Sequence, residues 1–359
     1  MITRAQTLAR AAELRARFEA AGALPVETPI LQSAETLLDL YGEDIRARAY
    51  VTSDALRGEQ MLRPDFTVPV VQMHMEQGAE PARYTYAGEV FRRQEEDPGR
   101  ASEYVQVGYE VFDRSAPAAA DAEVFAQISE ALRPLELRAA TGDIGILMAA
   151  VAGLDTTDAR KSALLRHIWR PRRFRALLDR YAGRVPAAKH REALLAGQIA
   201  SAAPVIGKRT AAEIAARIEA LREDAAAPPL STAEVALLDM LLGVRETLPF
   251  ALEQLRDISV DMPAIAPAVS RLGERSQALA ARGVDVDALA FEASFGRASM
   301  EYYDGFVFGF FSPQHPDWPA IATGGRYDAL TRRLGQGREI PAVGGVLRPG
   351  LMLELEARP

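Results

Sequence analysis

Residues 103–112, EYVQVGYEVF, alternate between two kinds of side chain, and this alternation constrains the fold more than any other feature of the sequence. Successive side chains of a strand point to opposite faces of a sheet, so Gln106, Gly108 and Glu110 share one face. The other face carries Val and Tyr side chains. Two interpretations fit the polar face: a half-exposed antiparallel strand in contact with solvent, or the wall of a pocket.

Other strand-like segments lie toward both ends of the chain and surround a helical middle. The turn signal Pro98-Gly99 lies between residues 82–93 and 103–112 and predicts an antiparallel hairpin. From about residue 120, Ala and Leu recur at helical spacing. We therefore expect an α+β fold with one mainly antiparallel sheet, built from both ends of the chain and flanked by helices. The remaining strand-like segments are residues 49–54, 60–71, 300–311 and 341–347.

The first residues predict an amphipathic helix. Leu8, Ala11, Leu14 and Phe18 recur at helical spacing, and Gly22 stands where a C-cap would end the helix. Charged residues are spread through this segment, so it lacks the apolar region of a secretory signal. No apolar run in the sequence approaches membrane-spanning length. We expect a cytoplasmic protein with no membrane partner.

Composition excludes several kinds of chemistry. The chain has no cysteine and four scattered histidines, so it offers neither a thiol nucleophile nor a metal-ligand spacing, and we expect no metal and no cofactor. The formal net charge of -7 gives no overall attraction to nucleic acid. A local basic cluster is interpreted as solvated helix surface, although a nucleic-acid site is an alternative. Its residues are Arg170, Arg172, Arg173 and Arg175.

Five motifs in a fixed order resemble the catalytic domain of histidyl-tRNA synthetase, a class II aminoacyl-tRNA synthetase. The resemblance implies a class II aminoacyl-tRNA synthetase-like fold that forms homodimers through the first-motif region ETPILQS. It divides the chain into a core domain, residues 1–154 and 256–359, and a helical insertion, residues 155–255, with the C-terminal anticodon-binding domain absent and no tRNA bound. The motifs are LRPDFTVPV, VFRRQ with VQVGYEVF, MEYYDGFVF, GGRYDAL and PAVGG.

The resemblance also implies a pocket for free histidine. Histidine presents an ammonium, a carboxylate and an imidazole, so its pocket needs an anion, a cation and a donor/acceptor pair at fixed places. By position, the ammonium is addressed by Asp65, Thr67 and Gln106, the carboxylate by Arg92, and the imidazole by Glu110, Tyr303 and Tyr327.

Structural alternatives remain open for several of these residues. Tyr303 and Tyr327 also fit a role as core aromatic residues with a tethered hydroxyl. Arg92 has Glu89 and Glu95 as nearby partners for a simple ion pair. On a strand, Tyr302 would point to the face opposite Tyr303.

The nucleotide half of the synthetase pattern is missing. The family's third motif ends in Glu-Arg, where this chain has Gly350 and Leu351, and Arg348 lies three residues from the arginine position. Ala298 stands where the family has a second arginine that serves adenylation. Because positioned cations are the main catalysts of attack on a phosphate, we expect no catalytic residues and no adenylation.

A synthetase-like chain that keeps the histidine pocket but lacks the nucleotide-binding arginines resembles the regulatory subunits of ATP phosphoribosyltransferase. The resemblance implies a non-catalytic subunit that activates a short-form catalytic subunit, in a hetero-octamer of four plus four, in the first step of histidine biosynthesis. Histidine would be its effector and would act by feedback inhibition, bound in the synthetase-type pocket or at a subunit interface. The alternatives are a histidine-activating enzyme core and a stand-alone histidine-sensing module.

Overall fold

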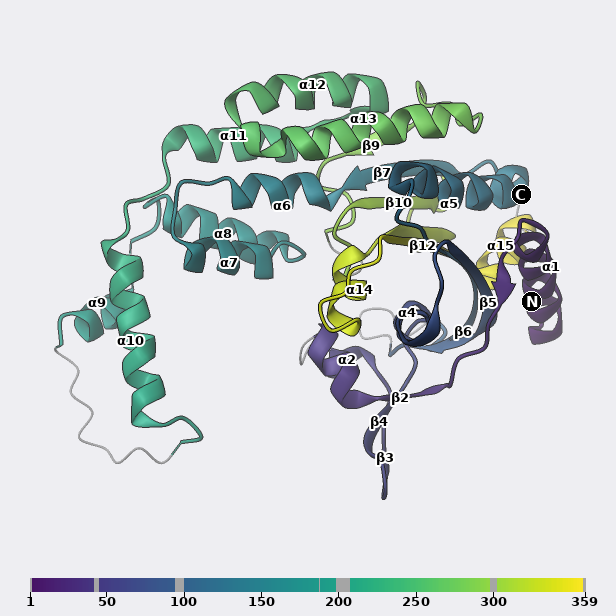
Figure 1. The fold of residues 1–359 in the computed structure, drawn as a ribbon, viewed down its shortest axis with the longest axis horizontal. Helices are drawn as coiled ribbons and strands as arrows, with labels where there is room; N and C mark the ends of the chain where they lie inside the picture. Colours follow the sequence, from purple (N-terminus) through teal and green to yellow (C-terminus); the bar gives the residue numbers. More distant parts are fainter. Residues whose placement is uncertain are drawn as a thin grey trace.

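The computed structural model describes residues 2–41, 45–93, 100–186, 188–197, 207–297 and 302–357. Figure 1 shows a large curved sheet with helices on both faces, and a pair of helices, α9 and α10, that extends away from it. Both chain termini lie on the same side of the molecule, beside the first and last helices. The predicted class, a mainly antiparallel sheet flanked by helices, is confirmed.

The main sheet contains nine strands within the described residues, in the order β1-β5-β6-β12-β11-β10-β7-β9-β8. The pairs β1–β5 and β7–β9 are parallel and the other pairs are antiparallel. Strands from both ends of the chain therefore share one sheet, as the sequence predicts. The strands are β1 (Leu24–Pro25), β5 (Ala82–Phe91), β6 (Glu103–Phe112), β7 (Arg138–Asp143), β8 (Arg245–Thr247), β9 (Ala290–Glu292), β10 (Phe306–Phe311), β11 (Ala322–Arg326) and β12 (Ala342–Leu347).

Strands β5 and β6 form the predicted hairpin and fix the two faces of the sheet at the site. Their register pairs Gly88 with Gln106 and Tyr84 with Glu110. On the opposite face of β6, the ring of Tyr109 packs on Phe18 of the first helix, with 5.1 Å between ring centroids. The alternation in the sequence therefore assigns the faces of β6 correctly. The predicted turn at Pro98-Gly99 lies outside the described residues.

Helices cover the two faces of the sheet differently. The face that carries Tyr109 packs against α1 and α5, and α13 packs outside α5. The opposite face is covered by α4 and α14, which pack against each other (Figure 1). The helices of these layers are α1 (Arg4–Ala20), α4 (Thr67–Gln77), α5 (Pro117–Leu132), α13 (Ala266–Ala281), α14 (Asp328–Leu334) and α15 (Pro349–Glu356).

The helical middle of the chain is also present. Residues 155–255 contain α7 to α11, and they also contain β8, which pairs with β9 of the main sheet. The division into a core domain, residues 1–154 and 256–359, and a helical insertion, residues 155–255, stays a prediction. The helices are α6 (Ile144–Ala152), α7 (Asp158–Arg166), α8 (Pro171–Tyr181), α9 (Lys189–Leu195), α10 (Ala211–Ala226), α11 (Thr232–Gly243) and α12 (Leu248–Asp261), with short 3-10 turns at Arg133–Leu135 and Pro263–Ile265.

A small second sheet lies below the main one and carries part of the predicted dimer motif. Its strand order is β2-β4-β3, with antiparallel pairing throughout. Helix α2 begins directly after β2. The elements of this region are β2 (Leu31–Ser33), α2 (Ala34–Tyr41), α3 (Ile45–Arg48), β3 (Val51–Asp54) and β4 (Gly58–Leu62).

Helix α1 agrees with the predicted amphipathic helix except at one position. Thr3 and Gln6 form a capping box at its start, and Gly22 follows its end with a φ of 95°. The side chains of Leu14 and Phe18 are buried. Leu8 was expected on the apolar face but is 42% exposed, and it lies one turn before Ala11, the first buried residue of the helix.

Residues 67–71 were predicted as part of a strand, and this prediction was wrong. They form the first turns of α4, and the β-branched residues Thr67 and Val68 gave the strand-like signal. Pro69 is tolerated there because the first N–H groups of a helix have no intrahelical acceptor. The carboxylate Oδ1 of Asp65 accepts the N–H of Val68 at 3.3 Å, so this residue satisfies the start of the helix.

A buried network of charges connects the layers behind the site. Asp121 on α5 accepts from Arg275 Nε of α13 at 2.7 Å and from Arg326 Nη2 of β11 at 2.7 Å. Arg275 also pairs with Asp143, and Arg326 with Asp328, both at 2.9 Å. The side chain of Asp121 is 2% exposed, so removal of its carboxylate leaves two buried guanidiniums with too few acceptors.

Replacement Asp121→Ala is expected to lower the free energy of unfolding by about 3–5 kcal/mol in urea titrations, because breaking one partner of a buried pair leaves the others uncompensated. The matched control is Glu219→Ala on α10, whose partner Arg222 lies on the surface. The control should change the free energy by no more than about 0.5 kcal/mol. Equal effects of the two replacements would contradict a structural role for the buried network.

Candidate functional site

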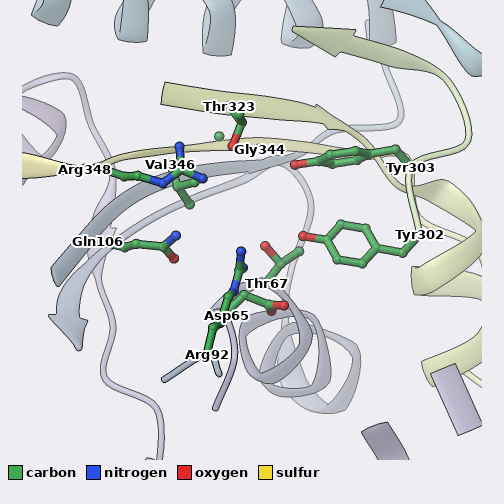
Figure 2. A pocket seen from close by; sticks show the side chains of 11 residues that line it. Asp65, Thr67, Arg92, Gln106, Tyr302, Tyr303, Thr323, Gly344, Val346 and Arg348 are labelled. Atoms are coloured by element: carbon green, nitrogen blue, oxygen red, sulfur yellow. The ribbon is translucent and has the colours of Figure 1, made fainter. Parts of the chain in front are cut away.

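A cavity of about 120 Å³ lies between the sheet and the start of α4. One water needs ~10–15 Å³ of such space, so the cavity has room for roughly ten water-sized groups, the scale of a free amino acid. Figure 2 shows polar side chains that enter it from β6, β11 and α4, and charged side chains from residues next to α4, β5 and β12. The lining residues are Asp65, Thr67, Arg92, Gln106, Tyr302, Tyr303, Thr323, Gly344, Gly345, Val346 and Arg348.

Gln106 is the most informative residue of the cavity wall. Its side chain is 1% exposed, and neither its Oε1 nor its Nε2 has a hydrogen-bond partner among the residues that the structure describes. A buried amide without partners costs ~1–3 kcal/mol, and such groups are rare in folded proteins. Because Gln106 lies at the cavity surface, a ligand with polar groups would satisfy it (Figure 2).

Three charged side chains line the cavity: Asp65, Arg92 and Arg348. Asp65 precedes α4 and accepts the N–H of Val68, as described above. Arg92 follows β5, and its Nε donates to the carbonyl oxygen of Pro64 at 2.7 Å. Arg348 follows β12, and its Nη1 donates to the carbonyl oxygen of Ala320. Burial lowers the pKa of the Arg348 guanidinium, and the charge of Arg92 acts in the same direction.

The carboxylate of Glu110 lies just behind this cavity and is held by three hydroxyl groups. Thr67 Oγ1 donates to it at 3.2 Å, Tyr86 Oη at 2.8 Å and Tyr327 Oη at 2.5 Å. Burial raises the pKa of Glu110 to about 7, although the hydroxyl donors act to lower it. The carboxylate passes directly over Gly344, where an added Cβ would lie 1.3 Å from Oε2.

The structure brings five of the seven predicted residues together in the cavity wall: Asp65, Thr67, Arg92, Gln106 and Tyr303. The other two, Glu110 and Tyr327, do not line the cavity and are 1% exposed. Glu110 is connected to the cavity wall by Thr67, which lines the cavity and donates to Glu110, and Tyr327 donates to the same carboxylate. Glu110 and Tyr327 therefore form a second layer behind the wall.

Several lining residues were missed by the sequence analysis. Tyr302 was expected to face away from Tyr303, but both line the cavity and their hydroxyls point into it (Figure 2). The strand alternation does not apply, because β10 begins only at Phe306 and these two residues precede it. Thr323 and Arg348 were not predicted to line the cavity. Their positions follow from strand pairing in three dimensions, which alternation along one strand does not predict.

The described part of the chain offers neither a metal-ligand cluster nor a membrane-spanning helix. Within the residues that the structure describes, no group of three His, Asp or Glu side chains could hold a metal ion. None of the described helices is both long and apolar enough to cross a membrane. The arrangement is one of hydrogen-bond donors, acceptors and charges around a small polar ligand.

Comparisons with solved structures give the class of fold. A structure titled an ATP phosphoribosyltransferase regulatory subunit/histidyl-tRNA synthetase from Bacillus halodurans matches 98% of this chain and 79% of that chain, with a TM-score of 0.69 at 22% identity. Histidyl-tRNA synthetase from Nostoc sp. PCC 7120 matches 98% of this chain and 72% of that chain, with a TM-score of 0.65 at 18% identity. The family model described as histidyl-tRNA synthetase matches residues 3–227 and 210–349. The fold is that of the histidyl-tRNA synthetases.

Sequence relatives give the particular family. A protein from Agrobacterium fabrum is 35% identical over 360 residues, which cover 93% of each chain. A protein from Brucella anthropi is 32% identical over 358 residues, 92% of this chain and 93% of that protein. Both are named ATP phosphoribosyltransferase regulatory subunit. This chain belongs to the family of ATP phosphoribosyltransferase regulatory subunits, within the histidyl-tRNA synthetase fold.

Replacement Glu110→Gln is expected to change how stability depends on pH. The folded-state pKa of Glu110 lies above its ordinary value, so the folded state binds this proton more tightly than the unfolded state. The stabilising contribution is present at low pH and is lost as pH rises from about 4.5 to about 7. Relative to the wild type, Glu110→Gln should therefore gain about 3 kcal/mol in the free energy of unfolding between about pH 4.5 and about pH 7.5.

The measurement is urea unfolding of both proteins at the two pH values. Glu253→Gln, on the exposed side of α12, is the control and should follow the wild type at both. If the free energies of unfolding of the wild type and Glu110→Gln differ by the same amount at both pH values, the raised pKa of Glu110 is contradicted.

Proposed function

We propose that this chain regulates an ATP phosphoribosyltransferase and that histidine, bound in the cavity described above, lowers the activity of the assembly. The observation that carries the role is the family membership: relatives named as regulatory subunits match over 92–93% of the chain at 32–35% identity. The regulatory subunit is not itself a catalyst. In this proposal the chain activates a short-form catalytic subunit and carries its feedback inhibition in the first step of histidine biosynthesis.

The cavity supports histidine as the effector because each group of the ligand meets a matching group. Asp65 and Thr67 offer acceptors for the ammonium, and Gln106 offers an amide that has no other partner. Arg92 offers a cation for the carboxylate. Tyr303 offers a hydroxyl for the imidazole, from the side opposite Gln106 in the view of Figure 2.

Glu110 and Tyr327 act on the imidazole end from behind the wall in this proposal. Tyr327 donates to one oxygen of the Glu110 carboxylate, and Thr67 and Tyr86 donate to the other. This carboxylate fixes the direction of the Thr67 hydroxyl and places negative charge near a ligand N–H group. The two residues therefore set the polarity of the pocket without lining it.

Assembly is proposed to use the first-motif region for the homodimer, with four regulatory and four catalytic chains in the complete cytoplasmic complex. Apolar side chains of this region are exposed in the single chain, which supports an interface here. Strand β1 is also the edge strand of the main sheet. The exposed residues of the region are Ile30 at 44% and Leu31 at 47%, and two exposed apolar residues lie outside it, Leu24 of β1 at 63% and Val51 of β3 at 43%.

Feedback inhibition requires that histidine bind one state of the complex more tightly than another. A ~100-fold difference in affinity corresponds to ~2.7 kcal/mol of coupling, and equal affinities would give no regulation. The test is the rate of phosphoribosyl-ATP formation by a purified short-form catalytic chain, with and without this protein, as histidine is titrated. We expect activation on addition and its reversal by histidine. No activation, together with histidine-dependent exchange of pyrophosphate into ATP, would establish an amino-acid-activating enzyme instead.

Replacement Gln106→Leu should weaken histidine binding without a loss of stability. The leucine removes the amide that the ligand satisfies, so affinity measured by isothermal titration calorimetry should fall about tenfold. Because the amide has no partner in the free protein, the free energy of unfolding should stay constant or increase. Gln254→Leu, at an exposed position of α12, is the control and should keep wild-type affinity. Unchanged affinity in Gln106→Leu would place histidine elsewhere.

A further inference from the structure

Arg348 gives the cavity a second cation, whereas recognition of one carboxylate by the proposed pocket requires only Arg92. Both arginines line the cavity, and Asp65 is the one carboxylate in the lining among the residues that the structure describes. Arg348 directly follows Leu347, the last residue of β12, and so shares the strand face of Val346 and Gly344. The lining therefore carries an excess of positive charge before any ligand binds.

The guanidinium of Arg348 is held in place by neutral groups. Its Nη1 donates to the carbonyl oxygen of Ala320, and its side chain also forms a hydrogen bond with Tyr104. A guanidinium has five N–H donors in a planar fork, so these contacts leave donors available to a ligand. The held geometry also reduces the entropy that binding would cost.

The two arginines act on one another inside the cavity. Burial lowers the pKa of Arg348, and the positive charge of Arg92 lowers it further. Two cations in a partly buried space repel each other, and an anion that contacts both removes this repulsion. A carboxylate suits this position, because its two oxygens match the paired N–H groups of guanidiniums.

Gln106 supplies an independent indication of where a polar ligand group lies. Its buried amide has no partner, and in Figure 2 it is on the same side of the cavity as Arg348, opposite the hydroxyls of Tyr302 and Tyr303. Arg92 enters this space from below in the same view. The donors of Arg348, Arg92 and Gln106 thus surround the end of the cavity that lies away from the tyrosines.

We propose that Arg348 is a specificity-determining residue that holds the carboxylate of the ligand together with Arg92. The pocket consequently selects a free α-amino acid and rejects the corresponding alcohol, ester or amide. This inference rests on the proposed function for the identity of the ligand, histidine, but its requirement for a carboxylate holds for any amino acid that binds here.

The experiment compares L-histidine with L-histidinol, which has a hydroxymethyl group in place of the carboxylate, by isothermal titration calorimetry on the full chain. The wild type should bind histidine at least ~100-fold more tightly than histidinol, as expected when two partly buried cations lose their anion. Arg348→Gln should lower histidine affinity ~10- to 50-fold and leave histidinol affinity within ~2-fold. Arg348→Lys, which keeps the charge without the fork, should lose part of the histidine affinity.

The control is Arg222→Gln on the exposed surface of α10, which should bind both compounds as the wild type does. Equal losses for histidine and histidinol in Arg348→Gln would show that Arg348 only supports the backbone at Ala320, and would overturn the proposal, as would no loss for either compound. If the Arg348→Gln variant does not fold, the histidine and histidinol affinities of Arg348→Lys test the proposal in its place.

A thermal-shift screen of the twenty L-amino acids and their C-terminal amides separates this inference from the proposed function. If another amino acid binds in place of histidine, with dependence on both its carboxylate and Arg348, the histidine assignment fails and the present inference stands. If histidine binds without dependence on Arg348, the histidine assignment stands and the present inference fails. If no amino acid binds, both are wrong.

Discussion

The carboxylate of Glu110 and its three hydroxyl donors form the interaction on which the rest of the site depends. The donors come from α4, β5 and the residue before α14, whereas Glu110 itself is on β6. The donors lie up to 217 residues from Glu110 in sequence, and the carboxylate is the point where their elements meet. A buried carboxylate costs free energy unless its lone pairs are satisfied, so all three donors have to be in place. Gly344 permits this approach, because any side chain there would overlap Glu110.

The cavity follows from this arrangement. With Glu110 satisfied on one side of Thr67, the start of α4 is fixed against the sheet and Asp65 is positioned at the cavity surface. Gln106, on the same face of the same strand, has a side-chain amide without a hydrogen-bond partner among the described residues. The site thus combines a rigid, satisfied layer with an unsatisfied lining, which is the physical condition for strong and selective binding of a small polar ligand.

Much of this could be predicted from the sequence, because period-two alternation assigns the faces of a strand without ambiguity. The alternation placed Gln106 and Glu110 on one face of β6, and the motif resemblance added residues from four other segments. The sequence could not predict how deeply each side chain is buried, because alternation says which face a side chain occupies but not whether another layer covers it. Alternation therefore did not distinguish Glu110, which lies behind the cavity wall, from Gln106, which lies at the cavity surface. Tyr302 was assigned to the wrong face because strand geometry was assumed before β10 begins. Arg348 was dismissed as a substitute for a nucleotide-binding arginine, although its own position points into the cavity.

The central claim is that the cavity between β6, β12 and α4 is where histidine binds, and a crystal structure of this chain with histidine tests it most directly. The account predicts electron density for the amino acid in the cavity, with its α-carbon groups near Gln106 and its imidazole toward Tyr302 and Tyr303. Histidine bound at another surface, with only solvent in this cavity at saturating ligand, would contradict the account.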